Sequence, residues 1–142
     1  MVAETWAAFY PESPDASHPI FPGPLGPCIS DLTMFADYRV PQILHHLCIL
    51  TYPASLIRKL RKGKLLEPGS REEMSLRAAS IIAVEHVRTE MITSGSEREV
   101  SSVLIDFYLW DLAKKLEVGE EHIDGIQTND IMPAHRTRSI WY

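Results

Sequence analysis

Apolar residues recur three and four positions apart along most of the chain after residue 40, which is the period of an amphipathic helix. The pattern predicts an all-α helical bundle without a β-sheet. The expected helices cover Pro41–Leu50, Pro53–Lys62, Arg71–Thr93 and Glu97–Glu117.

Capping signals precede the two longer helices. Ser70 with Glu73, and Ser96 with Glu99, form S-x-x-E boxes in which the serine and the glutamate each accept a backbone N–H of the first turn. Both helices are therefore expected to begin close to these boxes.

A proline-rich stretch lies ahead of the helices. Most of the ten prolines fall between Tyr10 and Pro27, and proline removes a backbone donor and disfavours helix. Residues 10–28 are expected to form an irregular loop within a single α-helical domain that spans 1–142.

The last expected helix is apolar on two faces. One face comprises Val100, Val103, Leu104, Phe107 and Trp110, and the other comprises Ile105, Leu109, Leu112 and Leu116. A helix of this kind is expected to be covered on two sides and to lie centrally in the fold.

Carboxylates inside the two long helices differ in their local partners. Glu85 has Arg88 three residues on and Asp111 has Lys115 four residues on, so both can form helical ion pairs. Asp106 has no cation at these spacings. Because a buried carboxylate without a partner costs several kcal/mol, Asp106 is expected to meet a donor from elsewhere in the fold or from a ligand.

The segment LTMFADYRVPQIL places two charges, Asp37 and Arg39, in an apolar run just ahead of Pro41. Pro41 suits the first turn of a helix, where its missing N–H is not needed. On the residues alone, Asp37 caps that helix and Arg39 is exposed. The alternative is that Asp37 is a functional carboxylate presented at the corner.

The sequence HRTRSIWY, which closes the chain, combines cations with aromatic residues. If this segment docks, Arg136 or Arg138 is a candidate partner for Asp106 or a candidate site for an anionic substrate group. The alternative is a solvated basic tail.

Composition limits the classes of partner that the chain is expected to bind. The 142 residues carry a net charge of −5, which gives no general attraction to nucleic acid or to an anionic membrane. No apolar run is long enough to span a bilayer, and Cys28 and Cys48 match no metal or redox spacing. The histidines show no metal motif either, so no metal or cofactor is expected, and the setting is cytosolic or nuclear.

Several stretches together resemble the queuosine salvage protein family, the queuosine 5′-phosphate N-glycosylase/hydrolases. They are LTMFADYRVPQIL, GSREEMSLRAASIIAVE, VLIDFYLWD and HRTRSIWY, in the family's order, with VAETWAAF ahead of them. The resemblance implies an all-α fold similar to the helix-hairpin-helix DNA glycosylases. It also implies hydrolysis of the N-glycosidic bond of queuosine 5′-phosphate, a small-molecule nucleotide, to release queuine.

The resemblance also implies roles for individual residues. Asp37, in the family's FADYRVPQ motif, becomes the carboxylate that stabilises a ribosyl cation or activates water. Arg39 orients it or meets the phosphate, and Tyr38 stacks on the base or sugar. Asp106 contacts the amidine edge or the side-chain amine of queuine.

The length of the chain departs from the family. Members are more than twice as long, so this sequence resembles a C-terminal portion without the half that carries a K-R-A-Q-I lysine. Two hypotheses follow: an N-glycosidase whose activity is impaired in this form, or a catalytically silent helical module that acts in protein interaction. In either case apolar surface from Trp6, Phe9 or the VLIDFYLW helix is expected to face water.

Overall fold

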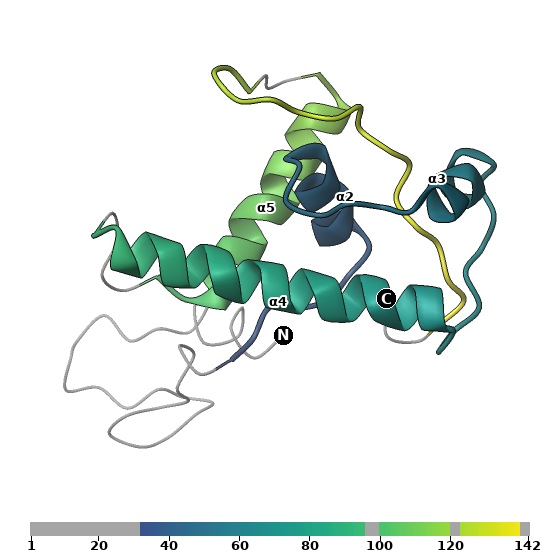
Figure 1. Ribbon diagram of the computed structural model, residues 1–142, viewed down its shortest axis with the longest axis horizontal. Coiled ribbons are helices and arrows are strands. Elements are labelled where there is room, and N and C mark those ends of the chain that lie inside the picture. Colours follow the sequence, from purple (N-terminus) through teal and green to yellow (C-terminus); the bar gives the residue numbers. More distant parts are fainter. Residues whose placement is uncertain (1–31, 96–99, 120–122, 140–142) are drawn as a thin grey trace, which may run out of the picture.

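A computed structural model describes residues 32–95, 100–119 and 123–139, and these form four helices (Figure 1). The helices are α2 (Arg39–His46), α3 (Ala54–Arg61), α4 (Arg71–Thr93) and α5 (Ser102–Glu117). The described residues contain no β-sheet; one isolated parallel bridge joins Leu66 and Thr137. The expected all-α class is confirmed.

Helix α4 has the bounds that its capping box predicts. The Ser70 hydroxyl accepts the N–H of Glu73 at 3.3 Å. The Glu73 carboxylate accepts in return from the N–H of Gly69, at 3.1 Å, rather than from that of Ser70. The long helix is therefore fixed at its start by local hydrogen bonds.

Helix α5 begins later than predicted. Its N-cap is Ser101, whose backbone is extended and whose hydroxyl accepts the N–H of Leu104 at 3.3 Å. A continuous helix from Glu97 is therefore wrong, because Ser101 supplies the cap. The predicted box of Ser96 and Glu99 lies outside the described residues.

Helix α2 also differs at both ends from Pro41–Leu50. It begins at Arg39, and it ends at His46 because Cys48 has a φ of 60° and turns the chain back. The N–H groups of Ile49 and Leu50 then both donate to the Leu44 carbonyl, at 2.9 and 3.0 Å. The predicted helix Pro53–Lys62 is present as α3, with Pro53 as its N-cap.

Figure 1 shows α4 lying across one side of the molecule, with α2 and α5 above it and α3 beside them. Helix α2 packs against both α4 and α5. The main core joins all three helices through Val40, Ile43, Leu44, Ala83, Val84, Ile105, Leu109, Leu112 and Ala113. A second cluster under α3 comprises Tyr52, Leu56, Leu60, Leu66, Leu76 and Met132.

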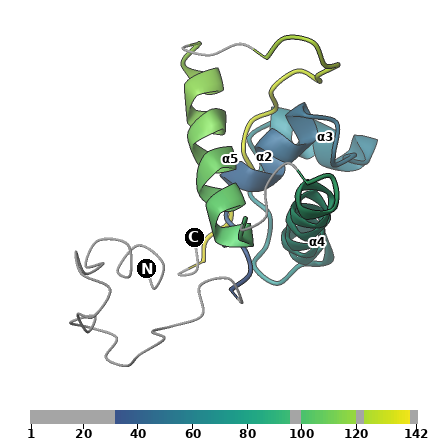
Figure 2. The ribbon, with the colours of Figure 1, turned by 90° about the vertical axis from the view of Figure 1, so that its left-hand side faces the viewer.

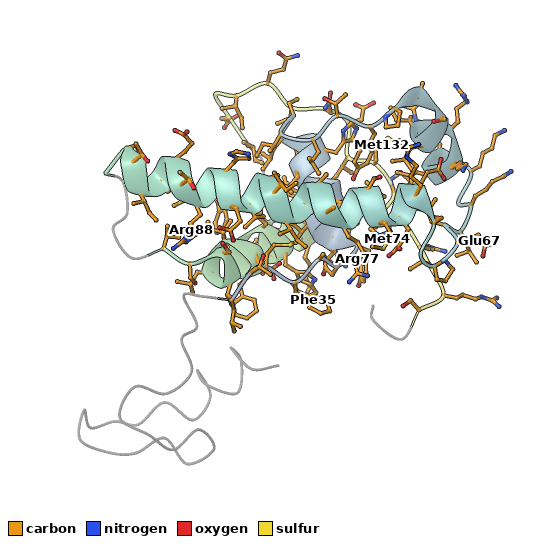
Figure 3. The ribbon with its side chains drawn as sticks, turned by 60° about the horizontal axis from the view of Figure 1, so that its bottom comes forward. Phe35, Glu67, Met74, Arg77, Arg88 and Met132 are labelled. Atoms are coloured by element: carbon orange, nitrogen blue, oxygen red, sulfur yellow. The ribbon has the colours of Figure 1, made fainter. Side chains whose placement is uncertain are left out.

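Two hydrogen bonds join α4 to the start of α5, and both involve residues that form an ion pair within α4. The predicted pair of Glu85 and Arg88 is confirmed, with a Nη1–Oε2 distance of 3.7 Å. Arg88 also donates from Nε to the Val100 carbonyl at 3.1 Å, and the Ser102 hydroxyl donates to Glu85. Figure 3 shows Arg88 on the side of α4 that faces α5.

Helix α5 is buried on one side rather than two. Ile105, Leu109 and Leu112 lie in the core. Leu104, Phe107 and Tyr108 are 56, 43 and 65% exposed. In Figure 2 the other labelled helices stand on one side of α5 and none stands on the opposite side. The predicted two-sided cover is therefore wrong within the described residues, whereas the expected exposure of this helix is confirmed.

The segment after α5 runs back past α2 and α3 toward the start of α4 (Figure 1). Asn129 closes the end of α2, because its N–H donates to the His46 carbonyl at 2.8 Å and its side chain donates to the His45 carbonyl at 2.9 Å. Further on, the Leu66 N–H donates to the Arg136 carbonyl at 2.8 Å. Among the described helices, none is both long and apolar enough to cross a membrane.

Candidate carboxylate site

Asp37 lies at the corner immediately before α2 and is buried. Its Oδ1 accepts the N–H groups of Arg39 at 2.8 Å and Val40 at 3.0 Å, two donors that have no partner within the helix. The expected helix cap is thus present. Both bonds end on Oδ1, so the cap uses one of the two carboxylate oxygens.

Asp106, from the middle of α5, is buried beside the same corner. Its Oδ2 accepts the N–H of Phe35 at 2.9 Å. The donor expected from elsewhere in the fold is therefore a backbone group 71 residues earlier in the chain. Neither Arg136 nor Arg138 is its partner.

Phe35 connects the two carboxylates. Its N–H donates to Asp106, and its carbonyl accepts the N–H of Asp37 at 2.8 Å. Figure 3 shows the Phe35 side chain projecting outward at this edge of the molecule. The two acids, 69 positions apart in the sequence, thus flank a single residue.

Burial and mutual repulsion shape the electrostatics of the pair. The pKa of Asp106 is raised to about 6, chiefly by burial and also by the negative charge of Asp37, against the lowering effect of the Phe35 hydrogen bond. Burial also raises the pKa of Asp37, against the lowering effects of the Val40 and Arg39 N–H groups, the Arg39 charge and the hydrogen-bonding side chain of Trp110. Asp37 is therefore supported as an anion by more groups than Asp106.

Arg39 is held next to this pair and is not a plain exposed side chain. Its Nη1 donates to Glu117 Oε2 at 2.6 Å. The guanidinium carbon lies 5.2 Å from the centre of the Trp110 ring and 5.7 Å from that of Tyr38, within the range of cation–π attraction. The alternative that Arg39 is simply exposed is wrong.

Glu117, the partner of Arg39, is also held by Gln42. Gln42 donates from Nε2 to Glu117 Oε1 at 2.8 Å and to the Met132 carbonyl at 2.8 Å. Burial alone would raise the pKa of Glu117, but the hydrogen bonds from Gln42 and Arg39 and the Arg39 charge lower it overall. The network ties the first turn of α2 to the last turn of α5.

Three members of this site were not predicted as site residues from the sequence: Trp110, Glu117 and Gln42. Trp110 lies four residues after Asp106, so it shares the same side of α5; that spacing was the available signal. Nothing in the local sequence links Glu117 to Arg39, because the two are 78 residues apart.

The other candidate residues lie as follows. Tyr38, the residue after Asp37, is about one-third exposed. Arg136 and Arg138 are exposed, and among the described residues neither forms an ion pair with Asp37 or Asp106. Asp111 pairs with Lys115 at 2.9 Å, as its spacing predicted.

A groove of about 750 Å³ lies elsewhere, along α4 and the turn after α2. Its lining includes Ile49, Ile82, His86 and Met91 but neither carboxylate of the pair. In the part of the chain that the structure describes, no three acidic, histidine or cysteine side chains come together as a metal site would require.

Comparisons with known proteins agree on one family. The sequence profile described as "Queuosine salvage protein" matches residues 1–142. The chain is similar to the "Queuosine 5′-phosphate N-glycosylase/hydrolase" of Mus musculus, with 43% identity over 119 residues that cover 80% of this chain and 32% of the relative.

Two more distant relatives carry the same name. The protein of Schizosaccharomyces pombe is 35% identical over 143 residues, which cover 100% of this chain and 37% of the relative. The protein of Nematostella vectensis is 34% identical over 159 residues, which cover 100% and 39%. The chain thus spans about a third of the length of the curated relatives that it matches.

Proposed function

Because the chain belongs to the queuosine salvage protein family, we propose that it carries the acidic site of an N-glycosidase that hydrolyses queuosine 5′-phosphate and releases queuine. The observation that carries the proposal is the buried pair of Asp37 and Asp106 around Phe35. The names of the relatives support the reaction and its substrate.

An N-glycosidic bond breaks through a ribosyl cation, in which positive charge develops on the sugar. A fixed carboxylate stabilises that charge or activates the water that attacks it, as carboxylates do in glycoside hydrolysis. Asp37 is suited to this role because two N–H groups fix its Oδ1. Neither backbone bond uses Oδ2, so this oxygen is the one we assign to the sugar or the water, with the Trp110 side chain as a further hydrogen-bond donor to Asp37.

Asp106 has the second role, a contact to the amidine edge or the side-chain amine of queuine. Its Oδ2 is held by Phe35, which leaves Oδ1 as the oxygen for the base. Since burial and repulsion from Asp37 raise its pKa, a cationic group of the substrate would stabilise its charged form on binding. Substrate binding and ionisation of Asp106 are therefore coupled in this proposal.

Tyr38 and Arg39 complete the site. The Tyr38 ring is accessible for stacking on the base or sugar. Arg39 is already paired with Glu117, so a role in orienting Asp37 requires no rearrangement, whereas a contact to the phosphate requires that pair to open. Arg136 and Arg138 remain candidates for the phosphate on the strength of their charge alone.

The fold proposal is that α2 to α5 form the C-terminal portion of a domain similar to the helix-hairpin-helix DNA glycosylases. The all-helical core of α2, α4 and α5 supports this class. A crystal structure of a complete family member, superposed on such a glycosylase, tests it. A helix order that fails to match would contradict it.

The reaction is tested with a chimera in which this chain replaces the matching segment of the Mus musculus relative. Incubated with queuosine 5′-monophosphate, the chimera is expected to release free queuine, measured by chromatography, in step with ribose 5-phosphate. The unmodified mouse protein is the control. No release from a folded chimera, while the control is active, would overturn the proposed function for this chain.

A further inference from the structure

The side of α5 that faces away from the core carries an apolar stripe. Leu104, Phe107 and Tyr108 lie three and four positions apart on one side of the helix and are 56, 43 and 65% exposed. We refer to these three residues as the outer face of α5. A helix that packs against the core on one side normally carries polar side chains on the side that faces water. An apolar outer face is therefore unusual for a surface that stays exposed.

The outer face leads directly to the carboxylates. At 100° per residue, Trp110 lies between Phe107 and Asp106 around the helix, and the Trp110 ring stacks on Arg39. Phe35, whose backbone N–H donates to Asp106, is 61% exposed. Two aromatic residues that hydrogen-bond the acidic pair, Phe35 and Trp110, are therefore partly open to water.

We propose that the outer face of α5 is the surface on which the remaining part of the family fold docks, and that this docking completes the wall of the site of Asp37 and Asp106. The occupant is argued from length: the match accounts for 32 to 39% of each relative, so most of each relative lies outside the matched segment. The completion of the site rests on the proposed function. The docking does not, because it is measured separately.

A second copy of this chain is the less favoured occupant, since in the relatives one polypeptide supplies both the matching segment and the remainder. The groove along α4 is the competing surface, with Ile82 58% exposed in its lining. That groove includes none of the residues that touch the acidic pair. Cover there would not close the site.

Hydroxyl-radical footprinting measures the docking directly. The oxidation rates of Phe107 and Tyr108 are compared between this chain alone and the chimera with the Mus musculus relative. Both rates are expected to fall about fivefold or more in the chimera, as for side chains that pass from exposed to buried at an interface core. Met74, 52% exposed on α4, is the internal control and should keep its rate.

Variants give a second measurement. The part of the mouse protein outside the match is produced separately and titrated onto this chain. Leu104→Ser with Tyr108→Ser is expected to weaken binding about tenfold or more, because apolar anchors at the centre of an interface dominate its affinity. Ile82→Ser, an equally exposed apolar change on α4, should leave the affinity unchanged. All positions changed are more than half exposed, so folding is retained and is checked by melting.

Three results would overturn the proposal. The first is a Tyr108 that is as reactive in the folded chimera as in the isolated chain. The second is protection of Phe107 and Tyr108 that is already present in the isolated chain, since other residues of this chain would then cover the outer face. Protection that grows with the concentration of the isolated chain counts the same way, since a second copy would then cover it. The third is a binding loss on Ile82→Ser rather than on the double change. Failure to release queuine with protection intact would refute the proposed function and leave the docking standing.

Discussion

Replacing Asp106 by asparagine tests the acidic pair without any need for catalysis. Asparagine keeps the size of the side chain and an oxygen for the Phe35 N–H, but it removes the charge that repels Asp37. Any change in stability with pH between the two proteins then reports the ionisation of Asp106.

The sign follows from the pKa. Burial and Asp37 raise the pKa of Asp106 from 3.8 to about 6 in the folded chain. The folded state therefore holds this proton more tightly than the unfolded state, and stability falls as pH rises between these values. The full loss is about 3 kcal/mol, since each pH unit between the two pKa values corresponds to about 1.4 kcal/mol.

The ionisation of His135 changes stability in the opposite direction over a similar pH range. Burial lowers its pKa from 6.5 to about 4, with Glu73 raising it and Arg77 lowering it. Its contribution to stability therefore rises with pH between these values. The parent protein alone would show a shallow pH dependence, so the comparison must be between variant and parent.

The assay is urea unfolding of the parent, Asp106→Asn and Asp111→Asn at several pH values from about 4.5 to about 7.5. The free energy of unfolding of Asp106→Asn, relative to the parent, is expected to rise by about 2 kcal/mol across this range, because part of the full effect lies below about pH 4.5. Asp111→Asn disturbs an exposed helical ion pair and should keep a constant difference of about 0.5 kcal/mol or less. If the free energies of unfolding of Asp106→Asn and the parent changed with pH in parallel, the conclusion that Asp106 and Asp37 form a close, buried pair would be wrong.

Three further outcomes are expected. Ile43→Ala, at a fully buried position of the main core, should lower the free energy of unfolding by about 2 to 5 kcal/mol, and a loss under about 1 kcal/mol would contradict the packing of α2. Ser70→Ala removes the cap of α4 and should cost about 1 kcal/mol, measured by the same unfolding; Ser75→Ala, on the exposed side of the helix, is the control. This chain alone should release queuine at least about a hundredfold more slowly than the chimera, because small misplacements of a site have such effects, and equal rates would show that the chain already holds a complete site.

The features that could be predicted from the sequence are those set by short spacings. The start of α4 follows from Ser70 and Glu73, three residues apart, and the pair of Asp111 and Lys115 follows from the helical repeat. The cap at Asp37 is equally local, since it accepts the N–H groups two and three residues further along the chain. In each case the partners are chain neighbours, so helix geometry alone brings them together.

The partner of Asp106 could not be found in this way. It is a backbone N–H, and every residue except proline offers that same donor. The need for a donor could be predicted from burial, whereas its identity depends on how the segment before α2 crosses α5. The pairing of Arg39 with Glu117 is hidden for the same reason, because distant packing creates it.

The exposure of α5 shows a second limit. Leu104 and Leu109 belong to the two apolar faces that the pattern predicts for this helix, yet one faces water and the other lies in the core. Periodicity identifies an apolar face but does not say what covers it. For α5, the cover is the subject of our proposal, because the local pattern of the helix does not identify it.

The most direct test of the central claim is the kcat/KM of the chimera for queuosine 5′-monophosphate with Asp37→Asn beside Asp111→Asn. Asp37→Asn keeps the shape of the corner but removes the charge that matters near the transition state, so kcat and kcat/KM should fall together by about a hundredfold to a thousandfold. Asp111→Asn should leave both nearly intact, with each variant shown to unfold cooperatively. Normal turnover by a folded Asp37→Asn protein would contradict the account and reduce this carboxylate to the cap of α2.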